Sequence, residues 1–298
     1  MTARVLLGTI AALLAAACAE SADRPSGPER LAAPPLASNT PPLPDLDGVP
    51  DLTVDAKRIE RTWMIREEEM STCAVVEGGA PEGTHRVLRF TATTPNVGTA
   101  DVFVGDPLEH VAADDGLFEF ATCHDHYHFR NYAVYELISV QTGAVLQAAK
   151  RGFCMVDVTR WAPGSVSGRA LYDRCGTRSS SGFQGVSVGW ADTYARVLDG
   201  QFFVLDDPAA PAPPGDYIIR VTVNPPFVCG AGDEARPRDA NGFCRMFVES
   251  SYDNNVGEAL ATVTSAKGPS GPGATQGLTS DELVSIYTKT GHPHDEPR

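Results

Sequence analysis

The chain has 298 residues, 42% of them hydrophobic, which is enough for one sizeable core or at most two small domains. Asp and Glu number 38 against 24 Lys and Arg, so the formal net charge at pH 7 is -14. This acidic balance argues against nucleic acid as a partner, because phosphates repel it, and favours cationic partners, including amines.

The N-terminal segment is typical of a signal peptide. Arg4 precedes an apolar run over residues 5–17, which is too short to span a bilayer but fits the apolar part of a signal peptide. The run ends in small residues followed by Cys18, as at a bacterial lipoprotein cleavage site. We therefore expect residues 1–17 to be removed and Cys18 to carry a lipid, the only membrane contact, at the cell envelope. Ordinary secretion and an uncleaved anchor are the alternatives.

Proline-rich segments flank the central part of the chain. Residues 18–47 are interpreted as a Pro-rich tether, since such a composition cannot build a core. Residues 265–298 are interpreted as a flexible C-terminal tail with one short helix over residues 280–287, capped by Ser280. The folded domain is therefore expected over residues 48–264.

Several segments of this domain alternate apolar and polar side chains, as β-strands do. They are residues 86–91, 132–138, 202–205, 216–223 and 258–264. Such strands, joined by Gly- and Pro-rich loops, predict a mostly β fold, an antiparallel β-sandwich with long loops and few helices. Residues 55–69 are compatible with one helix.

The cysteines fit an exported protein. In an oxidising compartment they can pair, and the six that remain apart from Cys18 fit three disulfides, for which 15 pairings exist. These six are Cys73, Cys123, Cys154, Cys175, Cys229 and Cys244. The alternative is six buried thiols.

The strongest local motif is Cys-His-Asp-His-Tyr-His at residues 123–128. On an extended strand, side chains two residues apart share a face, so His124, His126 and His128 would point the same way. Three imidazoles suit copper or zinc and leave coordination positions open. The alternatives are a solvated histidine face and a zinc hydrolase, although no Glu stands beside the motif as in His-Glu-x-x-His.

The chain resembles the copper-dependent catalytic domain of the lysyl oxidase family over residues 48–264. The copper motif of that family, Cys-His-x-His-Tyr-His, matches residues 123–128 throughout. Residues 150–154, Lys-Arg-Gly-Phe-Cys, resemble the segment with the family's cofactor lysine, and residues 189–194, Gly-Trp-Ala-Asp-Thr-Tyr, the segment with its cofactor tyrosine. Four further collinear matches are residues 50–52, 96–101, 217–225 and 249–255.

The resemblance implies an amine oxidase that makes its own cofactor, lysine tyrosylquinone, from Lys150 and Tyr194. With copper and molecular oxygen, such an enzyme converts primary amines, above all lysine side chains of proteins, to aldehydes and releases ammonia and hydrogen peroxide. Taken singly, Lys150 and Tyr194 would be a surface lysine and a core tyrosine. The alternative function is accordingly a non-catalytic, copper-binding exported lipoprotein on the same fold.

The chain departs from the animal members at two places. They carry Trp-x-Trp-His before the copper cysteine, whereas residues 118–121 here are Phe-Glu-Phe-Ala. Because Ala121 cannot bind metal, only the three histidines are assigned as ligands. Val134 stands where the animal enzymes have a histidine proposed as the base, which leaves Asp192 and Asp157 as candidates for the proton-abstracting base.

The resemblance also suggests structural bonds. Together with short loop closures, it suggests the disulfides Cys73–Cys123, Cys154–Cys175 and Cys229–Cys244. Related enzymes bind calcium with a segment that matches Glu249, Asn254 and Asn255 and with an Asp-Leu pair, here Asp51 and Leu52. Calcium prefers carboxylate, amide and backbone oxygens. Ser251 replaces a family carboxylate, for which Asp253 could compensate, and the alternative is an Asx-rich turn.

Overall fold

A computed structural model describes residues 43–148, 150, 152–162 and 170–290. The chain divides after Thr40, and all described residues belong to the second of its two units. The predicted signal segment, Cys18 and most of the predicted tether therefore lie outside the described residues.

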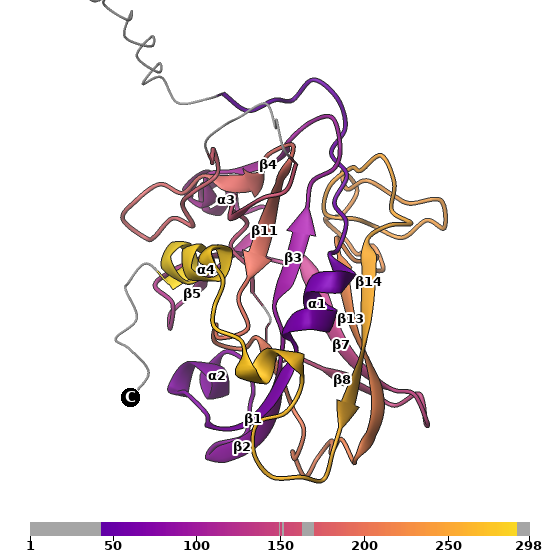
Figure 1. The fold of residues 1–298 in the computed structure, drawn as a ribbon. Coiled ribbons are helices and arrows are strands. Elements are labelled where there is room, and N and C mark those ends of the chain that lie inside the picture. The colour runs from indigo at the N-terminus through magenta and orange to yellow at the C-terminus, as the bar shows by residue number, and fades with distance from the viewer. Residues whose placement is uncertain (1–42, 149, 151, 163–169, 291–298) are drawn as a thin grey trace, which may run out of the picture. The chain divides into compact units, whose positions relative to one another are not determined.

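Strands account for most of the regular structure, and helices are few and short (Figure 1). The helices are α1 (Ala56–Thr62), α2 (Thr72–Val76), α3 (Pro107–Ala113) and α4 (Ser280–Thr290), with the 3-10 helix η1 (Pro272–Thr275). The strands are β1 (Met64–Glu69), β2 (Thr84–Arg89), β3 (Ala92–Pro95), β4 (Val102–Gly105), β5 (Phe118–Ala121), β6 (His126–Phe129), β7 (Ala133–Ser139), β8 (Val145–Gln147), β9 (Thr159–Arg160), β10 (Gln184–Val186), β11 (Trp190–Tyr194), β12 (Phe202–Val204), β13 (Gly215–Val223) and β14 (Val256–Val263). The predicted mostly β class is confirmed.

The strands pair in antiparallel sheets. One has the order β14-β13-β7-β8, another β1-β2-β12, and a third β3-β11-β9, with the two-stranded sheets β10-β4 and β5-β6 beside them. In β13 alternate side chains, among them Ile219 and Val221, are buried, as the period of two in the sequence predicts. Phe90 packs against Tyr135 of β7 and Phe203 of β12, at ring centroid distances of 5.2 and 5.5 Å. The core therefore joins the first two sheets face to face, as in a sandwich.

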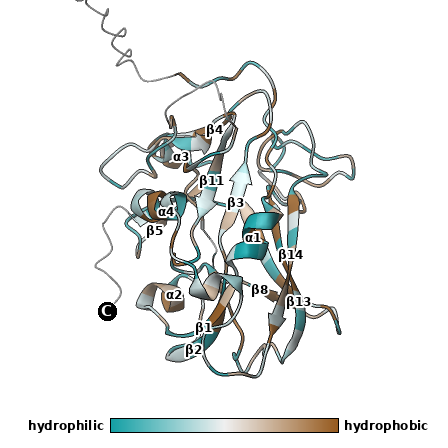
Figure 2. Ribbon diagram, viewed as in Figure 1, coloured by the Kyte–Doolittle hydropathy of each residue, from teal (hydrophilic) through white to brown (hydrophobic). Residues whose placement is uncertain are grey.

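The predicted helix over residues 55–69 is right in its first half and wrong in its second. The Asp55 side chain accepts a hydrogen bond from the Arg58 N–H and begins α1, whose side chains are mostly hydrophilic (Figure 2). Trp63 is extended and ends the helix, and β1 follows at once. Met64 and Ile65 are buried where β1 pairs with β2, so sheet packing outweighs the helical propensity of the charged residues that follow.

Three disulfides join the residue pairs that the resemblance suggested. They are Cys73–Cys123, Cys154–Cys175 and Cys229–Cys244, with Cα–Cα distances of 5.5, 5.4 and 5.3 Å. The first connects α2 to the turn that precedes β6, and the second braces the segment between β8 and β10.

The residues after 264 pack against the body as far as they are described. The helix predicted over residues 280–287 extends from Ser280 to Thr290 and lies along β11. Its N-cap is Thr279 and not Ser280: the Thr279 hydroxyl accepts from the Glu282 N–H at 3.4 Å, and the Thr279 N–H donates to the Glu282 carboxylate at 2.9 Å. Among the described residues, no helix is both long and apolar enough to cross a membrane.

Candidate active site

The histidine motif forms a hairpin and not one continuous strand. β5 pairs with β6, which places His126 opposite Ala121 and His128 opposite Glu119. Asp125 has a φ of 52°, a left-handed conformation that Asp tolerates better than most residues, and it interrupts the extended backbone. His124 therefore comes from the turn, and the predicted strand begins only at His126.

The turn nevertheless brings all three imidazole rings together. Ring centroids are 4.8 Å apart for His126 and His128, 5.4 Å for His124 and His128, and 5.6 Å for His124 and His126. Burial is the main cause that lowers the pKa of each ring, to about 3 for His126, with neighbouring positive charges acting in the same direction. The imidazoles are therefore neutral at pH 7, the form that binds metal.

The donor set fits copper chemically, and two of its three members already converge. The Nε2 atoms of His126 and His128 are 3.1 Å apart, close to the roughly 3.3 Å between two nitrogens that share a tetrahedral ion. His124 is turned aside: its Nδ1 lies 3.1 Å from a Glu77 carboxylate oxygen, without the geometry of a hydrogen bond. Consequently no three His, Cys, Asp or Glu side chains of the described residues form a ready metal cluster, and His124 would have to turn to complete one.

Lys150 and Tyr194, which are 44 residues apart in sequence, lie next to each other in the fold. Tyr194 ends β11 with 1% of its surface exposed, and its hydroxyl donates to the Cys154 carbonyl at 2.8 Å. The Lys150 Nζ lies 5.1 Å from the centroid of the Tyr194 ring and 5.2 Å from that of Phe153. Burial lowers the pKa of Lys150 to about 8 and raises that of Tyr194 well above its ordinary value.

Gly152 allows the lysine segment to approach the histidine hairpin. A Cβ at this position would lie only 2.0 Å from the Nδ1 of His128 and 2.6 Å from its Cγ. The backbone there is fixed by the Phe129 N–H, which donates to the Phe153 carbonyl at 2.6 Å. Only glycine therefore lets this segment pass so close to His128, and that approach places Lys150 beside the imidazoles.

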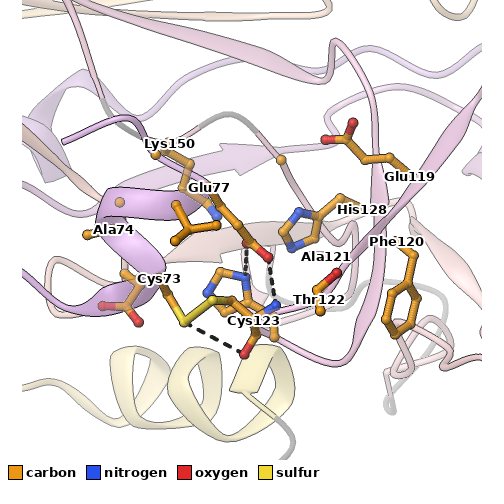
Figure 3. Close-up of a pocket in the computed structure, with 16 residues that line it drawn as sticks. Cys73, Ala74, Glu77, Glu119, Phe120, Ala121, Thr122, Cys123, His128 and Lys150 are labelled. Carbon is orange, nitrogen blue, oxygen red and sulfur yellow. Dashed lines mark hydrogen bonds and ion pairs between the residues drawn. A yellow bond between two sulfur atoms is a disulfide. The ribbon is translucent and has the colours of Figure 1, made fainter.

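A cavity of about 410 Å³ opens beside these residues. Figure 3 shows Lys150, Glu77 and His128 around it, with the Cys73–Cys123 disulfide at one side. Its other lining residues include the acidic Glu119 and Asp199. The lining thus combines carboxylates with an amine and imidazoles, a surface that attracts a small cation. Tyr194 does not line the cavity, and Lys150 stands between the two.

The family model for lysyl oxidase matches residues 50–235, a span that contains the hairpin, Lys150 and Tyr194. The chain belongs to the lysyl oxidase family. The bovine (Bos taurus) lysyl oxidase homolog 4 is 30% identical over 199 residues, which cover 63% of this chain and 24% of that protein. The human (Homo sapiens) lysyl oxidase homolog 1 is 30% identical over 195 residues, covering 61% and 30%, and the chicken (Gallus gallus) homolog 2 is 26% identical over 263 residues, covering 82% and 29%. The chain thus matches less than a third of the length of these relatives.

The lysyl oxidase fold separates the two carboxylates that the sequence offered as bases. Asp157 accepts hydrogen bonds from the backbone N–H groups of Leu171, Tyr172 and Ser187 and from the Ser187 hydroxyl, so both of its oxygens are engaged. Asp192 lies on β11, fully buried, two residues before Tyr194, and its Oδ2 has no hydrogen-bond partner among the described residues. Asp157 therefore has a structural position, and Asp192 is the carboxylate beside the ring.

Lys289 also belongs to this site, and sequence reasoning did not identify it. Its Nζ donates to Asp192 Oδ1 at 2.5 Å and to the Cys154 carbonyl at 2.6 Å, and it lies 4.0 Å from the centroid of the Tyr194 ring. Lys289 was part of the expected tail. The pattern Thr279-Ser280-Asp281-Glu282 is a capping box, which could have indicated a defined helix but not its buried lysine.

The residues predicted to bind calcium also meet, although they are about 200 positions apart in sequence. Glu249 accepts from the Leu52 N–H at 2.6 Å and from the Asn255 side chain at 2.5 Å, and the Asn254 side chain donates to Asp51 at 2.8 Å. The amide oxygens of Asn254 and Asn255 are buried without a hydrogen-bond partner among the described residues. Burial raises the pKa of Glu249 to about 7.

Two details of this cluster differ from the expected ligand set. Leu52 presents its N–H to Glu249, whereas a ligand would have to present its carbonyl. Asp253 is exposed, and its N–H donates to the Ser251 hydroxyl in a local turn, so it does not replace the missing carboxylate. The orphaned amide oxygens nevertheless supply one of the donor types that bind calcium.

Proposed function

We propose that this protein catalyses the oxidative deamination of primary amines, with copper and a lysine tyrosylquinone derived from Lys150 and Tyr194. One observation carries the proposal: the Lys150 Nζ lies 5.1 Å from the centroid of the buried Tyr194 ring, and Lys150 lines the same cavity as His124 and His128. Packing alone would not require an amine between a buried aromatic ring and a histidine cluster, because even a partly buried amine costs free energy unless it is compensated.

The three histidines would hold the copper ion. His126 and His128 already face each other through Nε2 at 3.1 Å, and Gly152 covers the opposite nitrogen of His128. His124 would complete the set by turning from Glu77, which would then remain at the edge of the cavity. Bound copper, together with oxygen, supplies the oxidising power by which the tyrosine ring becomes a quinone.

The surroundings of Lys150 favour a covalent crosslink between its amine and the Tyr194 ring. Phe153 contacts the Tyr194 ring edge to face, with centroids 5.1 Å apart and an interplanar angle of 88°, and so fixes its orientation. With its pKa lowered to about 8, Lys150 is unprotonated near neutral pH more often than an ordinary lysine, and an unprotonated amine is the nucleophile that such a link needs. The cofactor, if formed from Lys150 and Tyr194, would supply an electrophilic carbonyl that no ordinary side chain provides.

The substrate would enter through the acidic cavity. Glu77, Glu119 and Asp199 line it, and the chain as a whole carries a net charge of -14, so a cationic amine is attracted both locally and at long range. Lys150 lines the cavity, so an alkylamine such as the lysine side chain of a protein would meet the cofactor there. Asp192 would take the proton from the substrate carbon, through the Oδ2 that has no hydrogen-bond partner among the described residues.

Export and calcium complete the proposal. We propose that residues 1–17 direct the protein out of the cytoplasm, that Cys18 carries a lipid or the chain is secreted, and that residues 18–47 tether the domain. The Glu249, Asn254 and Asn255 cluster would bind calcium and connect the two ends of the domain, since Asp51 and Leu52 lie beside it.

The decisive experiment is a reaction of the copper-loaded, aerobic protein with phenylhydrazine, which labels quinones. We expect a coloured adduct in the wild type and none in Tyr194→Phe. The matched control is Tyr217→Phe, which removes the hydroxyl of another buried tyrosine whose partner is the Pro213 carbonyl, and it should label normally. An adduct of equal intensity in Tyr194→Phe would exclude this cofactor. A wild type that binds copper but never labels would favour the non-catalytic copper-binding function.

A further inference from the structure

Lys289 is a buried lysine that lies outside the span matched by the family model. That span ends at residue 235, whereas Lys289 belongs to the last turn of α4. Only 5% of its surface is exposed, and its Nζ is 4.0 Å from the centroid of the Tyr194 ring, closer than the Nζ of Lys150 at 5.1 Å. This chain thus places a second amine at the ring from a segment that the family match does not include.

The helix that carries Lys289 is attached to the strand that carries Tyr194. The Ser285 hydroxyl donates to the Thr193 carbonyl at 2.5 Å and accepts from the Ala195 N–H at 3.2 Å, so it binds the backbone on both sides of Tyr194. One turn earlier on α4, Glu282 is fully buried and pairs with Arg196 at 2.7 Å. Three successive turns of α4 therefore hold β11 where it ends, and α4 is a fixed wall of the site and not a displaceable cover.

The contacts of Lys289 all go to groups that surround the ring. Asp192 precedes Tyr194 by two residues on β11, and the Cys154 carbonyl that accepts from Lys289 also accepts from the Tyr194 hydroxyl. A buried ion pair can often be replaced by apolar side chains without loss of stability, so packing alone would not require a charge here. The charge at position 289 therefore points to a role at the ring.

We propose that Lys289 is a positioning residue of this site, which fixes the Asp192 carboxylate and the Cys154 carbonyl around the Tyr194 ring and so holds the ring toward Lys150. The inference rests on the proposed function, because the ring has to be oriented only if Lys150 joins it. Lys289 itself stays outside the link, since its ammonium is engaged with two acceptors. Without Lys289, the buried Asp192 carboxylate would lose its ion pair, and the ring would lose its neighbour on that side.

The test measures formation of the link and not only turnover. The full chain is prepared without copper as wild type, Lys289→Met, which keeps length but removes charge, and Lys289→Arg, which keeps charge. Lys267→Met, at an exposed lysine, is the matched control. After aerobic addition of copper, peptide mapping by mass spectrometry follows the Lys150–Tyr194 crosslink over time, and bound copper per chain is determined in parallel.

We expect Lys289→Met to bind as much copper as the wild type but to form the crosslink at least about tenfold more slowly, the size of effect that a misplaced reacting group produces. Lys289→Arg should recover a large part of the rate, and Lys267→Met should match the wild type. An unchanged rate in Lys289→Met, or a crosslink that maps to Lys289 in the wild type, would overturn the inference. A wild type without any crosslink would overturn the proposed function first, so the two failures can be told apart.

A double variant covers the case in which Lys289→Met folds poorly. Lys289→Met combined with Asp192→Asn removes both buried charges, so the copper-free double variant should melt at a higher temperature than Lys289→Met alone. It should still form the crosslink slowly. Equal melting temperatures of the single and double variants, or a wild-type crosslinking rate in the double variant, would contradict the role assigned to the pair.

Discussion

The closest backbone approach in the site leads to a sharp prediction for Gly152→Ala. The added Cβ would lie 2.0 Å from the His128 Nδ1, where ordinary contact begins at 3.4 Å, so one of the two groups must move by about 1.4 Å. His128 cannot easily yield, because it is buried on the paired strand β6 and its ring packs against two other imidazoles. Overpacking of this kind costs about 1–3 kcal/mol.

A displacement of His128 by this distance would also weaken copper binding. Metal ligation tolerates deviations of only about 0.2 Å in bond length, and loss of a group that orients a ligand typically lowers affinity about 10–100-fold. We therefore expect Gly152→Ala to bind copper about 10–100-fold more weakly, measured by competition with a coloured chelator, and to be less stable in urea. Gly277→Ala is the control, because a Cβ there meets nothing within 4 Å. If Gly152→Ala bound copper within about twofold of the control, the proposed contact between the lysine segment and His128 would be refuted.

Three further predictions concern other groups. His126→Ala should lose stoichiometric copper and activity, and metal analysis showing unchanged copper would remove it from the ligand set. Burial raises the pKa of Asp157 to about 6, so its stabilising contribution is present below pH 4 and is lost as the pH rises through 6, about 3 kcal/mol in all. Urea unfolding of Asp157→Asn should lack this component, and a wild-type-minus-variant difference that is constant from pH 4 to 7 would disprove it. Calcium at about 100 times its Kd should stabilise the wild type by about 2.7 kcal/mol but not Glu249→Ala, and a melting temperature insensitive to chelation would exclude the site.

The fold could be predicted where side-chain alternation decides the structure. β13 extends from Gly215 to Val223, almost as predicted for residues 216–223, because one face of the strand is buried and a period of two follows from that. The same principle failed at residues 64–69. There only Met64 and Ile65 are buried, and the charged residues after them carry no apolar stripe that would distinguish a strand from a helix.

The candidate site was predictable only in part, for physical reasons. The three histidines could be found locally, because their spacing in the chain is short enough to bring the rings together in either a strand or a turn. The proximity of Lys150 and Tyr194 came from the resemblance alone, since no local rule connects positions 44 residues apart. The roles of Gly152 and Lys289 depend on what the folded chain places against them, which a single sequence does not reveal.

The charges in the site distinguish the two lysines beside the Tyr194 ring, Lys150 and Lys289. Asp192 is the one carboxylate of the described residues that pairs with Lys289, and its Oδ1 lies 2.5 Å from that ammonium. A single buried carboxylate compensates one ammonium well and a second one poorly. The amine of Lys289 is paired with Asp192, although it lies nearer to the Tyr194 ring than the amine of Lys150 does. The amine of Lys150 lies beside the acidic cavity and the imidazoles. Under the proposed function, the ion pair between α4 and β11 would leave the Lys150 amine as the one free to react. A chain with Asp192 replaced by an uncharged residue should then lose this difference between the two lysines before it unfolds.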